Sequence, residues 1–346
     1  MKVLIISSFN VHLNNFLNLL NHVDSKLNIL VASNFQPQQN VDKFCLIHFS
    51  LKNPFSLLKN IIKLSREISD FSPDIIHIHQ ANSVAFITYL ALLFSKHKPK
   101  KKILTTWGSD ILILPEKNFL TRWMVKFALK KSDLITYDAK IVQQKIQHLC
   151  PELKHEQLKF FFYGIDLPDK IDFSTKENII YSNRLHKSIY RIDKIINAFS
   201  IFSQKNKNWK LIIAANGQQT DDLKKLVISK GLIDKIEFVG WLNKLENMQW
   251  YLRSKIYVTI PESDAGSVSL IEAMACGCYC IVSDIPANIE MIETQNGYVV
   301  SNVNDDFFSP AIESYIKHFN PEDSRKKVEF YSKDNQSKLI YSIYKS

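Results

Sequence analysis

Apolar and polar positions along this chain follow two alternating patterns. Short apolar runs such as Val3–Ile6 and Ile256–Ile260 are typical of buried strands. Between such runs, apolar residues recur every three or four positions, as at 54–71 and 118–131, which is typical of amphipathic helices. Strands that alternate with helices predict parallel sheets covered by helices on both faces. On the helix at 54–71 the apolar face is expected to include Leu57, Leu58, Ile61, Ile62, Leu64 and Ile68.

This alternation stops once and then begins again. Residues 167–176 are polar and contain proline, which indicates a linker, and the next strand is expected at Asn178–Ser182. We therefore expect two α/β domains, at residues 1–170 and 171–325. The last segment, 326–346, is expected to form a closing helix with Leu339, Ile340, Ile343 and Tyr344 at helical spacing.

One strand–loop–helix–strand unit, at residues 255–284, carries the candidate chemistry. Ser267 is a good residue to begin its helix, and Gly277 is placed to end it in the left-handed conformation. A helix start leaves backbone N–H groups for a phosphate, here those of Gly266, Ser267 and Val268. Two carboxylates, Asp264 and Glu272, can accept hydrogen bonds from the hydroxyls of two sugar rings on either side of that phosphate.

Composition limits the class of protein. The 346 residues are 46% hydrophobic and 23% charged, as in a globular protein long enough for two domains. The longest apolar run, 84–94, is about half as long as a membrane span. The amino terminus, MKVLIISSFN, is expected to be a strand rather than a signal peptide, and five cysteines, an odd number, favour the reducing cytoplasm.

Cysteine and glycine patterns weigh against metal and nicotinamide chemistry. Cys276, Cys278 and Cys280 alternate, as metal ligands sometimes do, but Cys280 begins a predicted buried strand and core positions are favoured for all three. The chain has 8 Gly and no Gly-x-Gly-x-x-Gly segment, so a nicotinamide enzyme is disfavoured.

The net charge of +10 is concentrated in the first half of the chain. Residues 1–170 hold 22 Lys and Arg against 13 Asp and Glu, whereas the remainder holds 22 against 21. The first domain is therefore expected to meet an anionic partner, although no nucleic-acid-binding module is present. Basic residues gather at 96–102 and on the helix 118–131, whose Phe119, Trp123 and Phe127 suit an anionic membrane surface. The alternative is that these aromatic side chains pack in the core.

The segment Glu272-Ala273-Met274-Ala275-Cys276-Gly277, with Asp264 before it, resembles the nucleotide-sugar motif of family-4 retaining glycosyltransferases. That family usually has Glu where this chain has Asp264. The resemblance implies the α/β GT-B architecture, in which two Rossmann-like domains face each other across a cleft and a C-terminal helix crosses back to the first domain. It also implies that Glu272 holds the ribose of the nucleotide and that Asp264 holds the donor sugar.

Further matches to this family follow in chain order through the second domain. Arg184 matches the arginine of the family's Gly-Arg-Leu loop, and either Lys187 or Arg191 replaces its lysine, so that two cations would hold the diphosphate. Gly217 closes the segment where the family often has Gly-x-Gly, with Ala215 in place of the first glycine. Trp241 stands in the turn that the family places beside the nucleotide base.

Matches in the first domain concern the acceptor side. His12 follows the first strand, at a loop that similar enzymes place beside the acceptor. Trp107 and Asp110 stand in a Trp-Gly-Ser-Asp segment where the family usually has His-Gly-x-Asp. The segment Tyr163-Gly164-Ile165-Asp166 is similar to the one that ends the first domain in the family.

The resemblance implies a retaining, metal-independent hexosyltransferase that moves a sugar from a nucleotide-diphosphate sugar to a saccharide acceptor, without a cofactor. Arg184, Lys187, Asp264 and Glu272 would carry the chemistry. The basic first domain adds the hypothesis of a lipid-linked acceptor for cell-surface polysaccharide or lipopolysaccharide, at the cytoplasmic face of the inner membrane. Two alternatives stay open: a sugar-nucleotide epimerase on the same fold, and a nucleotide-sugar-binding protein without transfer activity. The sugar, the base, the acceptor and the linkage are not determined by the sequence.

Overall fold

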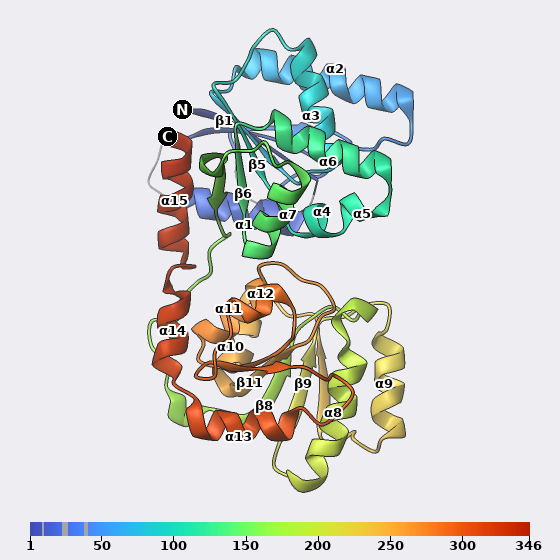
Figure 1. Ribbon diagram of the computed structural model, residues 1–346, viewed down its shortest axis with the longest axis vertical. Coiled ribbons are helices and arrows are strands. Elements are labelled where there is room, and N and C mark those ends of the chain that lie inside the picture. Colours follow the sequence, from blue (N-terminus) through green and yellow to red (C-terminus); the bar gives the residue numbers. More distant parts are fainter. Residues whose placement is uncertain (9, 23–26, 38–40) are drawn as a thin grey trace. The chain divides into compact units, whose positions relative to one another are not determined.

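Strands and helices alternate along the chain, and the computed structural model describes residues 1–8, 10–22, 27–37 and 41–346 (Figure 1). The chain divides into two units, which we call the first unit (1–164 with 333–346) and the second unit (165–332). Each unit contains one parallel β-sheet with helices on its faces. The predicted doubly wound α/β architecture is therefore confirmed.

The first unit is built on a sheet of seven parallel strands in the order β3-β2-β1-β4-β5-β6-β7. Strand β4 is buried at every position, because a parallel sheet is covered on both faces. The strands are β1 Lys2–Ser7, β2 Asn28–Ser33, β3 Lys43–Leu46, β4 Ile75–His79, β5 Lys101–Thr105, β6 Leu134–Tyr137 and β7 Leu158–Phe160. The helices are α1 Asn10–Asn21, α2 Pro54–Phe71, α3 Ser83–Phe94, α4 Ser109–Leu112, α5 Leu114–Lys117, α6 Phe119–Lys131, α7 Lys140–Leu149, the short 3-10 turn η1 His155–Gln157, and α15 Lys333–Lys345.

The second unit is built on six parallel strands in the order β10-β9-β8-β11-β12-β13. Its core is made by side chains of the strands and of helices α8 and α13, among them Ile180, Val258 and Phe308. The strands are β8 Glu177–Ser182, β9 Lys210–Ala214, β10 Ile236–Gly240, β11 Ser254–Thr259, β12 Tyr279–Ser283 and β13 Gly297–Val300. The helices are η2 Phe173–Thr175, η3 Ser188–Tyr190, α8 Ile192–Lys205, α9 Thr220–Ser229, α10 Lys244–Arg253, α11 Val268–Ala275, α12 Pro286–Ile289, α13 Phe308–His318 and α14 Pro321–Glu329.

The closing helix α15 packs on the first unit. Ile340 and Ile343 are buried in the same apolar cluster as Phe16 of α1. The Tyr344 hydroxyl lies 2.7 Å from Nδ1 of His77 in β4, and the Gln336 side chain accepts a 2.9 Å hydrogen bond from the backbone N–H of Phe162. These contacts join the last residues of the chain to the centre of the first sheet.

The two units meet in the sequence at different residues from those expected. The structure changes unit after Gly164 and after Ser332, whereas the sequence suggested limits at 170 and 325. Ile165 already pairs with the second unit, because its backbone N–H donates to the Tyr331 carbonyl at 2.8 Å. Polar composition could not show this backbone pairing.

The helix ends at 255–284 follow the sequence prediction. Gly277 has a φ of 69°, and its N–H donates to Met274 while that of Cys278 donates to Ala273. This is the left-handed ending that was predicted for α11, and it confirms the role of Gly277. All three of Cys276, Cys278 and Cys280 are buried, as core positions require.

Among the described residues, no helix is both long and apolar enough to span a bilayer.

Candidate functional site

The candidate site lies where the order of the second sheet reverses. Strands β8 and β11 are neighbours, but the chain leaves β8 toward β9 on one side and leaves β11 toward β12 on the other. Loops that follow such a pair of parallel strands diverge at their carboxyl ends, which is the usual place for a ligand in this architecture. The two loops here, 183–191 and 260–267, carry five of the residues that the sequence singled out, Arg184, Lys187, Asp264, Gly266 and Ser267.

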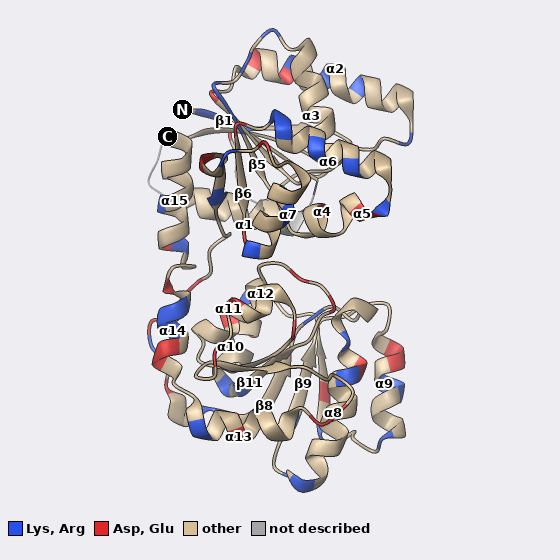
Figure 2. Cartoon of the chain, viewed as in Figure 1, with Lys and Arg blue, Asp and Glu red and all other residues tan. Residues whose placement is uncertain are grey.

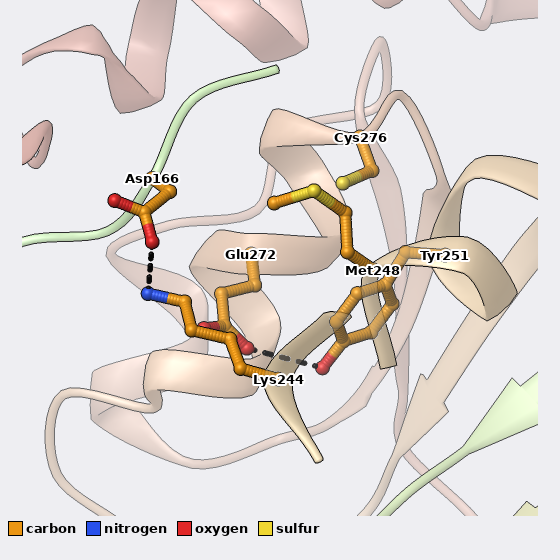
Figure 3. A pocket seen from close by; sticks show the side chains of 6 residues that line it. All are labelled: Asp166, Lys244, Met248, Tyr251, Glu272 and Cys276. Atoms are coloured by element: carbon orange, nitrogen blue, oxygen red, sulfur yellow. Dashed lines mark hydrogen bonds and ion pairs between the residues drawn. The ribbon is translucent and has the colours of Figure 1, made fainter. Parts of the chain in front are cut away.

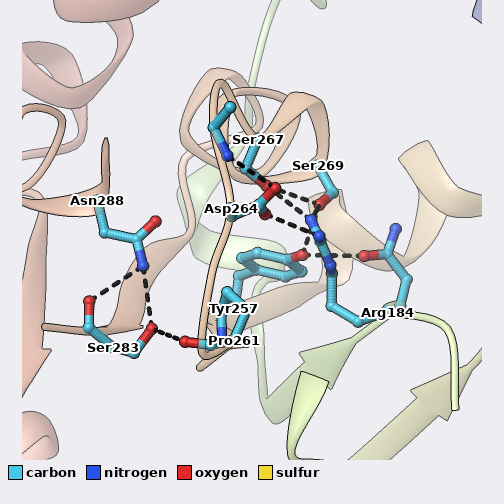
Figure 4. A network of polar contacts seen from close by, with 10 residues as sticks. Arg184, Tyr257, Pro261, Asp264, Ser267, Ser269, Ser283 and Asn288 are labelled. Carbon is cyan, nitrogen blue, oxygen red and sulfur yellow. Dashed lines mark hydrogen bonds and ion pairs between the residues drawn. The ribbon is translucent and has the colours of Figure 1, made fainter. Parts of the chain in front are cut away.

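Arg184 occupies the centre of this site. Its Nη2 lies 2.7 Å from the Asp264 carboxylate, and its Nη1 donates to the hydroxyls of Ser267 at 2.8 Å and Ser269 at 3.1 Å (Figure 4). The guanidinium also lies over the ring of Tyr190, with its centre 4.3 Å from the ring centroid. The side chains of Arg184 and Asp264 are only 12% and 20% exposed, so this ion pair is largely screened from water.

The start of helix α11 faces the same arginine. Ser267 is the N-cap residue, as predicted, but its hydroxyl does not cap the helix with a hydrogen bond to the backbone. It accepts from Arg184 instead. The first-turn N–H groups of α11 therefore receive no side-chain cap, which is the arrangement that suits an anion.

A chain of hydrogen bonds leads from Arg184 toward the second carboxylate. Ser269 accepts from the Tyr257 hydroxyl at 2.9 Å, and the same hydroxyl lies 2.9 Å from the Asn183 side-chain oxygen. The Asn183 amide donates to the Tyr251 hydroxyl at 2.7 Å, which in turn donates to Glu272 at 3.5 Å. Both predicted carboxylates, Asp264 and Glu272, thus belong to one polar network.

Glu272 of α11 lines a small pocket (Figure 3). Lys244 of α10 and Asp166 also line it and form an ion pair with each other. Its remaining lining residues are Met248, Tyr251 and Cys276.

The loop 183–191 supplies the two cations between which the sequence could not choose. Arg191 donates to Glu262 at 3.1 Å, and its backbone has a φ of 53°. Lys187 is exposed and forms no ion pair with any residue that the structure describes. Arg191 is therefore neutralised by a residue of the loop 260–267, and Lys187 is free to meet a ligand.

Gly217 and Trp241 lie in the loops after β9 and β10. A Cβ atom on Gly217 would lie 2.5 Å from the His186 carbonyl oxygen, so the loop 183–191 packs directly against this glycine. Ala215 adopts a φ of 69°, which is strained for a residue with a side chain. The Trp241 side chain is 67% exposed and has room to stack on a flat ring.

Two of the three residues expected on the acceptor side meet in the first unit. The His12 ring lies 4.3 Å from Trp107 and 5.3 Å from Tyr163, as centroid distances. These residues follow β1, β5 and β7, so the cluster lies at the carboxyl edge of the first sheet. Burial lowers the pKa of His12 to about 4 and that of His77 to about 3, and it places the pKa of His79 well below its ordinary value.

Asp110 stabilises two loops in the first unit. Its carboxylate accepts from the backbone N–H of Ala81 at 2.7 Å and from that of Trp107 at 2.9 Å. The side chain is buried, and burial raises its pKa to about 6 while the backbone donors act in the opposite direction. The structure therefore gives Asp110 a positioning role for the loop that carries Trp107.

Several members of the network could not be found from the sequence. Tyr257 was read only as an apolar strand residue, and Tyr251 and Asn183 were not singled out. Only Ser269 could have been found, because it follows the predicted helix start, Ser267, by two residues and a first-turn serine there can contact the same ligand or side chain. Which hydroxyl points toward Arg184 depends on strand register, and register is set by the sheet.

Within the described part of the chain, no group of three or more His, Cys, Asp and Glu side chains is arranged to hold a metal ion.

Comparison with known proteins gives matches to both halves of the chain. The family model described as glycosyl transferases group 1 matches residues 166–334, and the model described as glycosyl transferase 4-like matches residues 2–139. N-acetyl-alpha-D-glucosaminyl L-malate synthase of Bacillus anthracis is 25% identical over 65% of this chain and 61% of its own length.

Two more matches extend this comparison. The N-acetylgalactosamine-N,N'-diacetylbacillosaminyl-diphospho-undecaprenol 4-alpha-N-acetylgalactosaminyltransferase of Campylobacter jejuni is 22% identical over 68% of this chain and 63% of its own length. This chain thus spans less than two thirds of either of these two curated relatives. The crystal structure of Anabaena HepE in complex with UDP-glucose has a TM-score of 0.80 at 13% identity, and covers 100% of this chain and 99% of that one. This likeness confirms the predicted GT-B fold.

The buried histidines predict that acid destabilises the protein. His12, His77 and His79 have folded-state pKa values below the unfolded value of about 6.5, so below that pH the unfolded chain binds more protons than the folded one. Each group then removes up to about 1.4 kcal/mol of stability per pH unit. Asp110 has the opposite effect on stability. Its folded-state pKa of about 6 lies above its unfolded value, so between these values the folded protein binds more protons, but this is one group against three. We expect the denaturant midpoint to fall steadily from pH 7 to pH 5.

His12→Gln should make this fall smaller, because one of the three groups no longer titrates. A midpoint that stays constant between pH 7 and pH 5 would show that these histidines are protonated in the folded protein.

Proposed function

Because this chain belongs to the glycosyl transferases group 1 family, we propose that it transfers a sugar from a nucleotide-diphosphate sugar to a saccharide acceptor with retention of anomeric configuration. The observation that carries the proposal is the polar network of Arg184, Asp264 and Glu272 at the start of α11. It brings a largely buried cation, an uncapped helix start and two carboxylates to one site.

Each part of this network suits one part of the donor. Arg184 and the first-turn N–H groups of α11 bind the diphosphate, since both are donors directed at an anion. Glu272 accepts hydrogen bonds from the ribose hydroxyls, and Asp264 accepts from those of the transferred sugar. Trp241 stacks on the base. The Asp264–Arg184 pair fixes the carboxylate and the guanidinium relative to each other before the donor arrives.

The chemical step needs stabilisation of the leaving diphosphate. As the bond from the anomeric carbon to the phosphate oxygen breaks, positive charge grows on the sugar ring and negative charge on the phosphate. Arg184 and Lys187 stabilise that negative charge. The acceptor oxygen bonds to the anomeric carbon on the same face, and its proton passes to the phosphate oxygen that leaves. The products are the glycosylated acceptor and the nucleoside diphosphate.

We assign the acceptor to the carboxyl edge of the first sheet, beside His12 and Trp107. Burial keeps His12 neutral at physiological pH, so its ring can exchange hydrogen bonds without charge. A lipid-linked saccharide is the proposed acceptor, and cell-surface polysaccharide or lipopolysaccharide synthesis at the cytoplasmic face of the inner membrane is the proposed setting. The name of the Campylobacter relative, which includes diphospho-undecaprenol, supports this class of acceptor.

Removal of Arg184 tests the proposal directly. We expect Arg184→Ala to lower kcat by about 100-fold or more, because it removes a group that stabilises the leaving charge. The measurement is release of the nucleoside diphosphate, after a thermal-shift screen of nucleotide sugars has identified the donor. Glu272→Ala should likewise abolish turnover, through loss of ribose positioning.

Arg253→Ala is the matched control, because Arg253 forms an exposed ion pair with Glu177 in the same unit at 2.7 Å. Near-normal rates for both site variants would show that the site is assigned wrongly. Donor binding without hydrolysis or transfer in the natural protein would favour the binding-protein alternative instead.

Lys187 and Arg191 can be separated by substitution. We expect Lys187→Ala to lower kcat about tenfold or more, since this cation is unpaired within the described residues. Arg191→Ala should have a smaller effect, because Glu262 already neutralises Arg191. A larger loss in Arg191→Ala than in Lys187→Ala would reverse the assignment.

We also propose that transfer needs no metal, since protein cations and a helix start supply the charge that a metal would provide. Activity in excess EDTA should equal that of untreated enzyme. Loss of activity that Mg²⁺ or Mn²⁺ restores would contradict this and indicate a metal-dependent transfer.

A further inference from the structure

Helix α2 has a second apolar stripe that faces away from the core. Its inner face is buried at Ile61, Leu64 and Ile68, as the sequence predicted. Leu58 and Ile62, expected on the same face, are 53% and 40% exposed, and Phe55 in the first turn is 85% exposed. This stripe lines a groove along the helix together with three basic residues, Lys59, Lys63 and Arg66, and two acidic ones, Glu67 and Asp70.

Helix α6 also presents apolar side chains outward at its start. Phe119 is 82% exposed, Leu120 is 68% exposed and Trp123 is 44% exposed. The alternative that the aromatic face of this helix packs in the core is therefore wrong for Phe119 and Trp123. The core positions are taken by Met124, Val125, Ala128 and Leu129.

The two apolar surfaces lie on one side of the first unit. Helix α3 contacts both α2 and α6 (Figure 1). The ring centroid of Phe86, in the first turn of α3, lies 5.7 Å from that of Trp123. Helices that connect parallel strands run against the strand direction, so their first turns lie at the carboxyl edge of the sheet. Phe55 and Phe119 both stand in first turns. They therefore lie at the same edge as His12 and Trp107.

Basic residues surround these apolar side chains. Helix α6 carries Arg122, Lys126, Lys130 and Lys131 and no acidic residue, and Lys52 and Lys117 precede the two helices (Figure 2). Of the nearby acids, Glu67 pairs with Lys43, Glu116 with Lys145 and Glu152 with Lys130, and Asp70 also lines the groove on α2. The surface thus combines exposed apolar side chains with an excess of basic residues.

The basic run at 96–102 does not belong to this surface. Lys100 pairs with Asp74 and Lys102 with Asp133, and the Lys101 ammonium donates to the Ile343 carbonyl. The run precedes β5 and lies at the amino edge of the sheet, opposite to the first turns of the helices. Lys100, Lys101 and Lys102 thus have partners within the first unit, and of the two places where basic residues were expected to gather, only α6 belongs to this surface.

We propose that this surface, which we call the docking face (Phe55, Leu58, Ile62, Phe119, Leu120 and Trp123 with the basic residues around them), binds the surface of an anionic lipid bilayer. Exposed aromatic and aliphatic side chains enter the boundary between headgroups and acyl chains, while lysines and arginines meet the anionic headgroups. An excess of basic over acidic residues beside exposed apolar side chains suits anionic headgroups above an apolar layer. The inference extends the proposed function, because bound lipid would lie at the edge where the acceptor residues stand.

The test is co-sedimentation of the full chain with vesicles of phosphatidylcholine alone or of phosphatidylcholine with phosphatidylglycerol. We expect binding to the anionic vesicles only, with a several-fold decrease at high salt. The double variant Phe55→Ser with Phe119→Ser should lower the bound fraction about tenfold, because it removes the two most exposed apolar side chains of the face.

The matched control is Leu93→Ser with Phe94→Ser. These side chains are 70% and 65% exposed at the end of α3, at the opposite edge of the sheet, and their loss should leave binding unchanged. Equal thermal midpoints of the two double variants would show that both are folded. Negligible binding to both kinds of vesicle, equal loss in the control, or self-association through this face in light scattering would overturn the proposal.

Donor hydrolysis by the natural protein, measured without lipid, separates this inference from the proposed function. Hydrolysis without vesicle binding would overturn only the proposal that the docking face binds lipid. Vesicle binding without hydrolysis would overturn only the proposed transferase activity.

Discussion

A largely buried guanidinium governs the arrangement of the second unit. Moving Arg184 out of water costs several kcal/mol unless its donors are satisfied, and the protein satisfies them with Asp264, Ser267 and Ser269. These partners all come from the loop after β11 or the first turn of α11, so the ion pair holds that loop against the end of β8. The same contacts direct the Ser267 hydroxyl away from the helix backbone and leave the helix start open.

The loop 260–267, which contacts Arg184, is also held by hydrogen bonds between neutral polar groups. Ser283 in β12 donates to the Pro261 carbonyl at 2.7 Å, and the buried Asn288 amide donates to the Ser283 carbonyl at 3.0 Å (Figure 4). These bonds join the start of the loop after β11 to the end of β12. A site held in this way needs little reorganisation when an anion binds, and low reorganisation is what makes electrostatic stabilisation effective.

The first unit uses neutral rings where the second uses charge. His12 and His79 remain uncharged because burial disfavours the imidazolium by lowering its pKa. Asp110 accepts hydrogen bonds from two backbone N–H groups, and these bonds position the Trp107 loop. Such a surface suits hydroxyl groups and the faces of sugar rings better than it suits phosphate. Basic residues of this unit stand instead on α2 and α6, beside exposed apolar side chains. The proposed division of work between acceptor and donor follows from this difference.

Local sequence determined the elements and the ends of the site helix. The spacing of apolar residues and the positions of turn residues were sufficient to predict the alternating strands and helices. They also predicted Ser267 at the start of α11 and Gly277 at its end, because these features depend on neighbours in the chain. The resemblance of Glu272-Ala273-Met274-Ala275-Cys276-Gly277 to a known motif, with Arg184 in a second motif, indicated which loops carry the chemistry.

Only the tertiary structure decided how those loops are joined. The partners of Arg184, the neutralisation of Arg191 by Glu262 and the link through Tyr257 depend on which strands are neighbours and on their register, which the sequence does not state. The same holds for α2 and α6. A helix with more apolar residues than one face can hold leaves some of them outside, and the packing of the unit decides that Phe55 and Phe119 are the ones exposed.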